Sequence, residues 1–258
     1  MARNELLDNV THAGLRVDMR FGAGLGDAIS VVPAFATEFA ELQREYPIFF
    51  RRARDGGGYE AVALLGFERG ENLFVDDGRW NAGYLPGFFA RGPFLIGFQE
   101  RQRGGAQVRE PVIHVDLEHP RAGFSRGEPV FLPRGGHSPY LEHVITVLRG
   151  IHDGVEAGRE MVAAFESLGL LQPLRIDVGF DAERGASLAG LHGIDRERLA
   201  ALDAGELHRL HRAGWLEGAY LVLASQHNLR RLVAEKQRRL HVAAGAVAAP
   251  AASRAQDA

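Results

Sequence analysis

The residues whose types and spacing best fit catalytic chemistry are His114 and Asp116, two positions apart in an apolar run that favours a strand. Side chains at i and i+2 point to the same face of a strand. With a distant second histidine, such a pair forms the facial triad of a non-haem iron oxygenase, which leaves open positions for oxygen and co-substrate. The partner could be His137, His143 or His192. The alternative interpretation is a polar surface pair without metal.

Other motifs argue against common enzyme classes. Gly22, Gly24 and Gly26 follow a predicted strand, but the third glycine comes one residue early for a dinucleotide loop. A strand-like Ile-Ser-Val-Val run then follows, so a glycine-rich connection is the better interpretation. The sequence contains no P-loop pattern and no G-x-S-x-G motif. Its one lysine, Lys236, lies in an arginine-rich helix end, which argues against Schiff-base chemistry.

The most distinctive segment runs from residue 71 to residue 80 and joins three acids and an amide to an arginine and a tryptophan. Aromatic and arginine side chains carry much of the energy of recognition surfaces. A structural alternative pairs Arg79 with Asp76 across the turn. Asn228, in a polar interruption of an apolar helix, is either part of an internal network or a ligand contact. The candidate binding residues are Glu71, Asn72, Asp76, Arg79, Trp80, Tyr84 and Asn228.

Composition narrows the class of protein further. The chain has 258 residues, 46% of them hydrophobic, a formal net charge of -3 and no cysteine. The absence of cysteine excludes disulfide scaffolds, thiolate nucleophiles and iron–sulfur clusters. The near-neutral charge argues against a nucleic-acid binder. No apolar run approaches the ~20 residues that cross a bilayer, and the first fourteen residues lack the apolar core of a secretory signal.

Hydrophobic spacing places strands first and helices later, which predicts an α+β fold. We expect an antiparallel, β-rich N-terminal half packed against C-terminal helices in one domain, residues 15–241. We expect residues 1–14 to be flexible and the Ala/Pro-rich residues 242–258 to be disordered. The expected strands are 15–19, 29–32, 48–50, 61–65, 73–75, 94–98, 112–116, 129–132, 174–178 and 186–191. The expected helices are 33–45, 138–168, a short one from 195, 203–214 and 215–240.

Several stretches together resemble the SapC-like family of bacterial proteins. The resemblance covers residues 15–240 and is most specific between Gly70 and Pro86. The matching stretches are Val32-Pro33, Glu38-Phe39, Tyr46-Pro47-Ile48-Phe49-Phe50, Ala63-Leu64-Leu65-Gly66, Gly70-Glu71-Asn72-Leu73-Phe74-Val75, Gly78-Arg79-Trp80, Tyr84-Leu85-Pro86, 207–214 and 220–232. The sequence departs from the family pattern at His114 and in its Ala-rich tail.

The resemblance implies a link to the surface layer of Gram-negative bacteria and to outer-membrane uptake systems, and it supplies no catalytic residues. It does not extend to the peptide-transport permease of the same name. We therefore expect a non-catalytic accessory protein, cytoplasmic or peripheral to the envelope, that binds a protein or peptide partner and needs no cofactor. One alternative is a non-haem oxygenase that binds Fe(II) through His114 and Asp116. Another alternative is a small-molecule binding protein.

Overall fold

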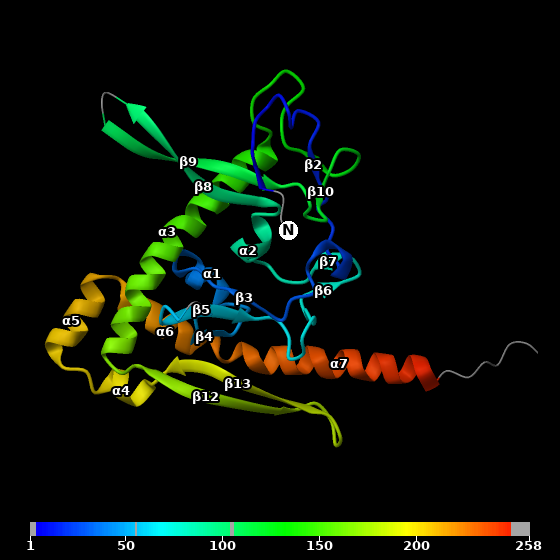
Figure 1. Ribbon diagram of the computed structural model, residues 1–258. Coiled ribbons are helices and arrows are strands. Elements are labelled where there is room, and N and C mark those ends of the chain that lie inside the picture. Colours follow the sequence, from blue (N-terminus) through cyan, green and yellow to red (C-terminus); the bar gives the residue numbers. More distant parts are fainter. Residues whose placement is uncertain (1–3, 55, 104–105, 249–258) are drawn as a thin grey trace, which may run out of the picture.

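The structure is a computed structural model that describes residues 4–54, 56–103 and 106–248. It contains antiparallel sheets, mostly in the N-terminal half, and a set of helices that dominates the C-terminal half (Figure 1). The expected α+β class is therefore confirmed. Among the described residues, no helix combines the length and the apolar character needed to span a membrane.

The largest sheet has five antiparallel strands in the order β12-β13-β4-β5-β3. Their bounds are β3 (Val31–Pro33), β4 (Ile48–Arg52), β5 (Tyr59–Leu64), β12 (Leu171–Gly179) and β13 (Gly185–Ile194). Strand β4 is central and almost wholly apolar at its start, because helices cover it. The ring of Phe50 meets Phe165 of helix α3 edge-on, and the hydroxyl of Ser225 in α6 accepts the N–H of Ile48 at 2.9 Å. This sheet and its helices form the main core.

A second, smaller core lies under a three-stranded sheet in the order β1-β9-β8. Its strands are β1 (Asn4–Leu6), β8 (Phe94–Arg103) and β9 (Ala106–Asp116). Residues 4–6 thus form a paired strand in a segment expected to be flexible. Short strands complete the region: β2 (Arg16–Val17), β10 (Ala122–Gly123) and β11 (Glu128–Pro129) form one sheet, and β6 (Val75–Asp76) pairs with β7 (Arg79–Trp80).

Helix α3 (Pro139–Ser167) joins the two cores, and its 29 residues make it about 43 Å long (Figure 1). Ser138 caps it by accepting the N–H of Leu141, and Pro139 opens it, as the sequence predicts. Leu141, Val144 and Leu148 enter the second core. Met161, Val162 and Phe165 enter the main core.

The remaining helices are short, apart from the last. They are η1 (Ala23–Leu25), η2 (Ala36–Glu38), α1 (Phe39–Leu42), α2 (Gly87–Ala90), α4 (Arg196–Ala200), α5 (Ala204–Arg212), α6 (Trp215–Ser225) and α7 (Asn228–Ala248). The helix expected over 33–45 begins later because Pro33 still belongs to β3. The helix expected over 215–240 breaks between Ser225 and Asn228. Helix α7 extends to Ala248, past the predicted start of the disordered tail, and residues 249–258 lie outside the described chain.

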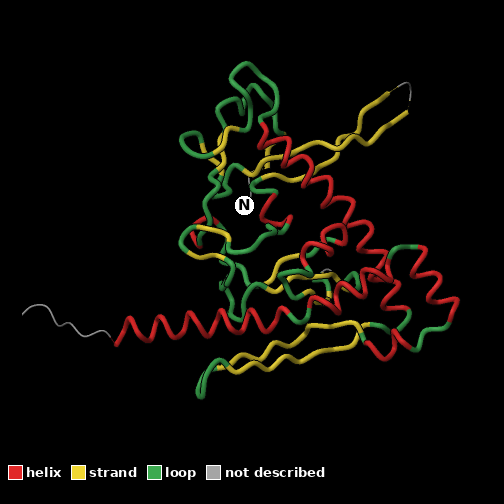
Figure 2. The backbone as a smooth tube through the Cα atoms, turned by 180° about the vertical axis from the view of Figure 1, so that it is seen from behind, coloured by secondary structure: helices red, strands yellow, loops and turns green. Residues whose placement is uncertain are grey.

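Two long hairpins extend from the body, β8–β9 and β12–β13, and α7 runs beside the second of them (Figure 2). The contact is made near the end of that hairpin, where Phe180 packs on Phe67 and lies 5.6 Å from the amine of Lys236. The start and the middle of α7, at Asn228 and Lys236, are therefore tied to the body, which fixes the loop between β5 and β6 against this helix.

The glycine-rich segment 22–26 is a structural turn. Asp27, which is 2% exposed, accepts the N–H of Gly22 at 2.8 Å and binds the guanidinium of Arg121 with both carboxylate oxygens at 2.7 Å. Gly26 has a φ of 88°, a conformation that favours glycine. The turn links two different sheets, and its polar groups are bonded within the chain.

Candidate functional site

The acidic part of the predicted contact segment is held by helix α7. The amine of Lys236 lies 2.7 Å from a carboxylate oxygen of Glu68 and 2.7 Å from one of Glu71, and only 6% of this lysine is exposed. The other oxygen of Glu71 accepts the N–H of Phe67 at 2.8 Å. The guanidinium of Arg238 pairs with Asp76 at 3.1 Å. These acids are therefore matched within the chain and shape the loop.

Asn72 has the same structural role. Its amide donates to the carbonyl of Asp27 at 2.9 Å, and its oxygen accepts the N–H of Phe74 at 3.0 Å. Arg239 of α7 reaches the same loop and donates to three of its carbonyls, those of Asn72, Leu73 and Val75. Lys236, Arg238 and Arg239, in the middle of α7, thus fasten this loop to the helix.

Trp80 packs inward with other aromatic rings. Its indole N–H donates to the hydroxyl of Tyr46 at 2.9 Å and to the carbonyl of Tyr84 at 3.2 Å. Its ring stacks on Phe74 with an interplanar angle of 16° and also contacts Phe21 and Phe89. Trp80 is therefore a half-buried residue that packs against the main core, and both of its hydrogen bonds are internal.

Arg79 and Asn228 have opposite environments. Arg79 is exposed on the β6–β7 hairpin, and no ion pair involves it within the described chain. Asp76 pairs with Arg238 and not with Arg79, so the ion pair expected across the turn does not form. Asn228 is buried at the start of α7 and donates to the carbonyl of Gln43 at 2.8 Å. This contact fits the structural interpretation of the polar interruption.

Tyr84 belongs to the same predicted set, and it lines a cleft. The cleft has a volume of about 400 Å³ and lies between η2, the segment before α2, and the middle of α3. We call it the Glu38 cleft, after the buried carboxylate among its lining residues. Its lining residues are Phe35, Thr37, Glu38, Tyr84, Leu85, Gly87, Ala90, His143, Thr146, Val147, Gly150 and Ile151.

Glu38 is 6% exposed and is held by three donors. One carboxylate oxygen accepts the N–H of Phe35 at 3.1 Å, and the other accepts the N–H of Gly87 and the hydroxyl of Tyr84, each at 2.8 Å. Burial raises the pKa of Glu38, while these hydrogen bonds act in the opposite direction. Burial and the nearby Glu38 charge also raise the pKa of Tyr84, so its hydroxyl stays protonated and donates.

Sequence reasoning did not select Glu38 as a candidate functional residue. Its reciprocal bond to the N–H of Phe35 is a capping-box contact, but the residue at the cap is phenylalanine, so the usual Ser/Thr-x-x-Glu signal is missing. The sequence also did not predict the close approach of η2 to α3. It depends on Gly154, where an added Cβ would lie 2.5 Å from the Thr37 hydroxyl oxygen.

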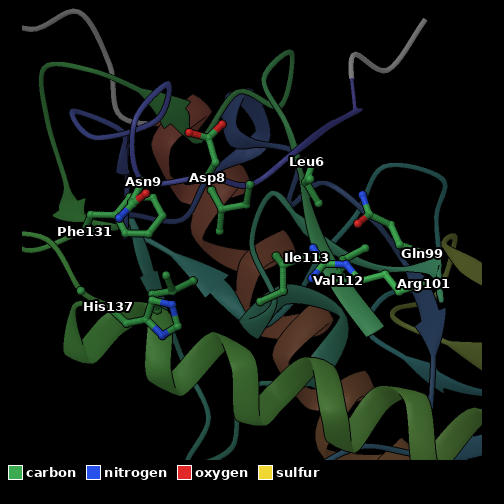
Figure 3. Close-up of a pocket in the computed structure, with 12 residues that line it drawn as sticks. Leu6, Asp8, Asn9, Gln99, Arg101, Val112, Ile113, Phe131 and His137 are labelled. Atoms are coloured by element: carbon green, nitrogen blue, oxygen red, sulfur yellow. The ribbon is translucent and has the colours of Figure 1, made fainter. Parts of the chain in front are cut away.

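A second cleft of about 400 Å³ lies beside strand β9 (Figure 3). Asp8 and Asn9 lie on one side of it, His137 lies at one end near α3, and Gln99 and Arg101 lie at the other (Figure 3). We call it the β9 cleft. Its lining residues are Leu6, Leu7, Asp8, Asn9, Gln99, Arg101, Val112, Ile113, Phe131, Gly136, His137 and Leu141.

The β9 cleft begins where strand β1 ends. The three residues of β1 pair with Asp116, Val115 and His114, and the N–H of Leu7 then donates to the carbonyl of Ile113 at 2.9 Å. Beyond that point, no strand in the described chain pairs with the outer edge of β9. The alternation of an antiparallel ladder also directs the backbone of Pro111 to this edge, where it offers a carbonyl but no N–H.

The structure does not assemble the predicted iron site. His114 packs over Gly97, where an added Cβ would lie 2.5 Å from its ring, and Asp116 accepts the N–H of Glu118 at 3.0 Å. His137 bonds to Glu142 at 2.8 Å, and His192 lies 3.3 Å from the Tyr59 hydroxyl. Over the described residues, no three histidine or acidic side chains come close enough together to hold a metal. The donor set of a facial triad is therefore missing here.

Fold and clefts together define an α+β protein with solvent-facing clefts, among them one at a strand edge and one lined by a buried carboxylate. The chain belongs to the SapC family, because the model of that family matches residues 7–232. This range takes in both clefts apart from Leu6. No curated protein and no solved structure matches the chain.

Proposed function

We propose that this protein is a non-catalytic accessory protein that binds an extended peptide segment of a partner protein along strand β9. The observation that carries the proposal is the open outer edge of β9 beside a cleft of mixed character. Extended peptides bind such edges by adding a strand: main-chain hydrogen bonds supply affinity, and pockets for alternate side chains supply specificity.

The chemistry of the β9 cleft supports a peptide occupant. Leu6, Ile113 and Phe131 offer apolar surface, while Gln99 and Asn9 offer amide groups near the strand edge. The charged groups already have partners: Arg101 lies 3.7 Å from Glu110, and His137 bonds to Glu142. A neutral, extended segment with alternating apolar side chains fits these surroundings better than a strongly charged ligand does.

The biological setting of the proposal is an inference from the resemblance described under Sequence analysis; the matching family model supplies only the family. Within the proposal, the partner is a protein or peptide of a bacterial surface-layer or outer-membrane uptake system. Within the proposal the protein acts in the cytoplasm or at the periphery of the envelope. The Glu71–Trp80 segment, in contrast, is a weak candidate for the contact surface, because most of its polar groups are bonded internally.

The test is the selection of a peptide from a displayed 12-residue random library, followed by affinity measurement with fluorescence polarisation. Asn9→Trp places an indole at the mouth of the β9 cleft, and we expect it to weaken binding at least tenfold. Val10→Trp is the matched control, because Val10 is the next residue, is 83% exposed and does not line the cleft. Equal effects of the two variants would contradict the proposed site.

The same peptide distinguishes strand addition from binding by side chains alone. N-methylation of alternate backbone amides removes donors without changing side chains, and one of the two alternating sets faces the strand edge. We expect one set of methylations to weaken binding at least tenfold and the other to have little effect. A peptide that tolerates both sets would show that the β9 edge makes no main-chain bonds.

A further inference from the structure

Glu38 is a buried carboxylate whose partners are all neutral. Its two oxygens accept from two backbone N–H groups and one tyrosine hydroxyl, which fill three of the roughly four acceptor positions of a carboxylate. Among the described residues, no lysine, arginine or histidine forms an ion pair with Glu38. A buried charge is normally matched by an opposite charge or a metal, because removing a charge from water is costly.

The surroundings of Glu38 make its negative charge the dominant one. Glu41 and Glu45 lie on the same short segment, and the latter accepts the N–H groups of Gly83 and Tyr84 at 2.7 and 3.1 Å. Glu41 and Glu45 each have an arginine partner, Arg44 at 3.0 Å and Arg231 at 3.1 Å. Glu38 differs from them in two respects: it lacks such a partner, and it lines a cleft.

The rest of the Glu38 cleft is suited to a small organic group. Phe35, Leu85, Val147 and Ile151 provide apolar walls, and the Tyr84 hydroxyl lies beside the carboxylate. A volume of about 400 Å³ falls in the usual range of small-molecule sites. A largely apolar cleft with one unmatched carboxylate in its lining selects for a cationic head on an apolar body.

We propose that the Glu38 cleft binds an alkyl ammonium or guanidinium group, with Glu38 as its counter-charge. The cation occupies the position that an arginine or lysine side chain takes at the neighbouring acids. This site shares no lining residue with the β9 cleft, so the proposal stands apart from peptide binding at the strand edge. The group can belong to a small amine or to a lysine or arginine side chain of a partner.

Thermal unfolding and calorimetric titration of the full chain test the proposal with hexylamine, agmatine and hexanol. We expect both cations to raise the melting temperature and the neutral alcohol, which matches hexylamine in shape, to leave it unchanged. An acetylated and amidated pentapeptide with one central lysine forms the second arm. Binding of the peptide at least tenfold tighter than hexylamine identifies a side chain as the source, and tighter hexylamine binding identifies a small amine.

Two variants locate the effect. Glu38→Gln should abolish the response to the cations, whereas Glu217→Gln, an exposed acid in the adjoining cleft on the other side of η2, should keep it. Because Glu38 is buried and its variant could fail to fold, Thr146→Trp provides a second test. Thr146 is exposed on α3, lines the Glu38 cleft and forms no hydrogen bond with Glu38, so we expect an indole there to occupy the cleft and leave the carboxylate in place.

The proposal is overturned by either of two results. One is an equal response to hexylamine and hexanol at concentrations up to tens of millimolar. The other is a response to hexylamine that survives in a folded Thr146→Trp protein. Loss of the response in Thr146→Trp together with its retention in Glu217→Gln supports the assignment of both the ligand class and the site.

Discussion

Two acidic regions of this protein differ in how their charge is matched. In the loop that begins at Glu71, the carboxylates of Glu71 and Asp76 form ion pairs with Lys236 and Arg238 of helix α7. In the Glu38 cleft, the carboxylate meets only neutral donors. The first region looks more functional in the sequence, yet most of its polar groups are used in holding the fold. The second gives little signal in the sequence and keeps an unmatched charge beside a cleft.

The difference gives a criterion for telling structural acids from ligand-binding acids. A structural acid has a cationic partner within the chain, and a ligand-binding acid lacks one. A matched buried pair is costly to break but offers nothing to a partner. An unmatched buried carboxylate lowers the free energy of unfolding, and a cationic ligand that pairs with it can restore part of that free energy. Substitutions in the matched acids should therefore change stability, whereas substitution of Glu38 should change binding and the dependence of stability on pH.

The largest effect is expected from the most deeply buried matched pair, Asp27 and Arg121. Arg121→Met leaves the Asp27 carboxylate without its cation at a site that is 2% exposed, and should lower the free energy of unfolding by about 4 kcal/mol. Urea unfolding measures the change. Asp27→Asn added to Arg121→Met should recover part of the loss, because the unpaired charge is then gone. A decrease in the free energy of unfolding of less than about 1 kcal/mol would contradict a stabilising role for the Asp27–Arg121 ion pair.

Lys236→Met should have the next largest effect. It leaves the carboxylate of Glu71 partly buried without a cation, and should cost about 2 kcal/mol, less than a fully buried pair because Glu68 is largely exposed. Urea unfolding again provides the measurement. Glu235→Gln is a matched control on the same helix, where the partners are the exposed Arg238 and the half-buried Arg239, and should cost no more than about 1 kcal/mol.

Glu38→Gln should change the pH dependence of stability. The folded-state pKa of Glu38 is raised above its ordinary value of 4.5, so the stability that this group contributes is fully present below pH 4.5 and is lost as the pH rises through the folded pKa. The glutamine variant lacks this loss. The stability of the variant relative to the wild type should therefore increase between pH 4 and pH 7, as measured by urea unfolding across that window. A constant difference would show that Glu38 does not titrate abnormally.

Arg79→Ala should have the smallest effect. Its side chain is exposed and has no ion pair among the described residues, so the free energy of unfolding should change by less than about 0.5 kcal/mol. Binding of the selected peptide should also stay within twofold of the wild type. Weaker peptide binding by Arg79→Ala would indicate that the β6–β7 hairpin contacts the peptide.

Local pattern was sufficient for much of the fold. Ser138-Pro139 predicts the start of α3, and Asp203 with Glu206 predicts the capping box of α5, because both signals lie within four residues. The break between α6 and α7 was not predicted. It depends on Ser225 and Asn228, which bond to the backbone of Ile48 and Gln43, and these partners are far away in the sequence.

The candidate sites were harder to predict for the same reason. Tyr84 was selected as an aromatic binding residue, and it does line a cleft, but its partner Glu38 lies 46 positions earlier. Conversely, Glu71 and Asp76 look available in the sequence because Lys236 and Arg238 are more than 160 positions later. Pairing across such separations is set by the fold, so no local spacing rule reveals which charges are already matched.

Helix α3 carries three glycines in its middle, Gly150, Gly154 and Gly158, spaced so that they share one side of the helix. Each weakens an isolated helix by about 1 kcal/mol relative to alanine. The η2 turn covers this stretch, and the Thr37 hydroxyl donates to the carbonyl of Gly150 at 2.8 Å. The η2 turn thus stabilises the middle of α3, the helix that joins the two cores. Local opening of η2 removes this support, so amide exchange in the centre of α3 should be faster than in the flanking turns that pack into the two cores.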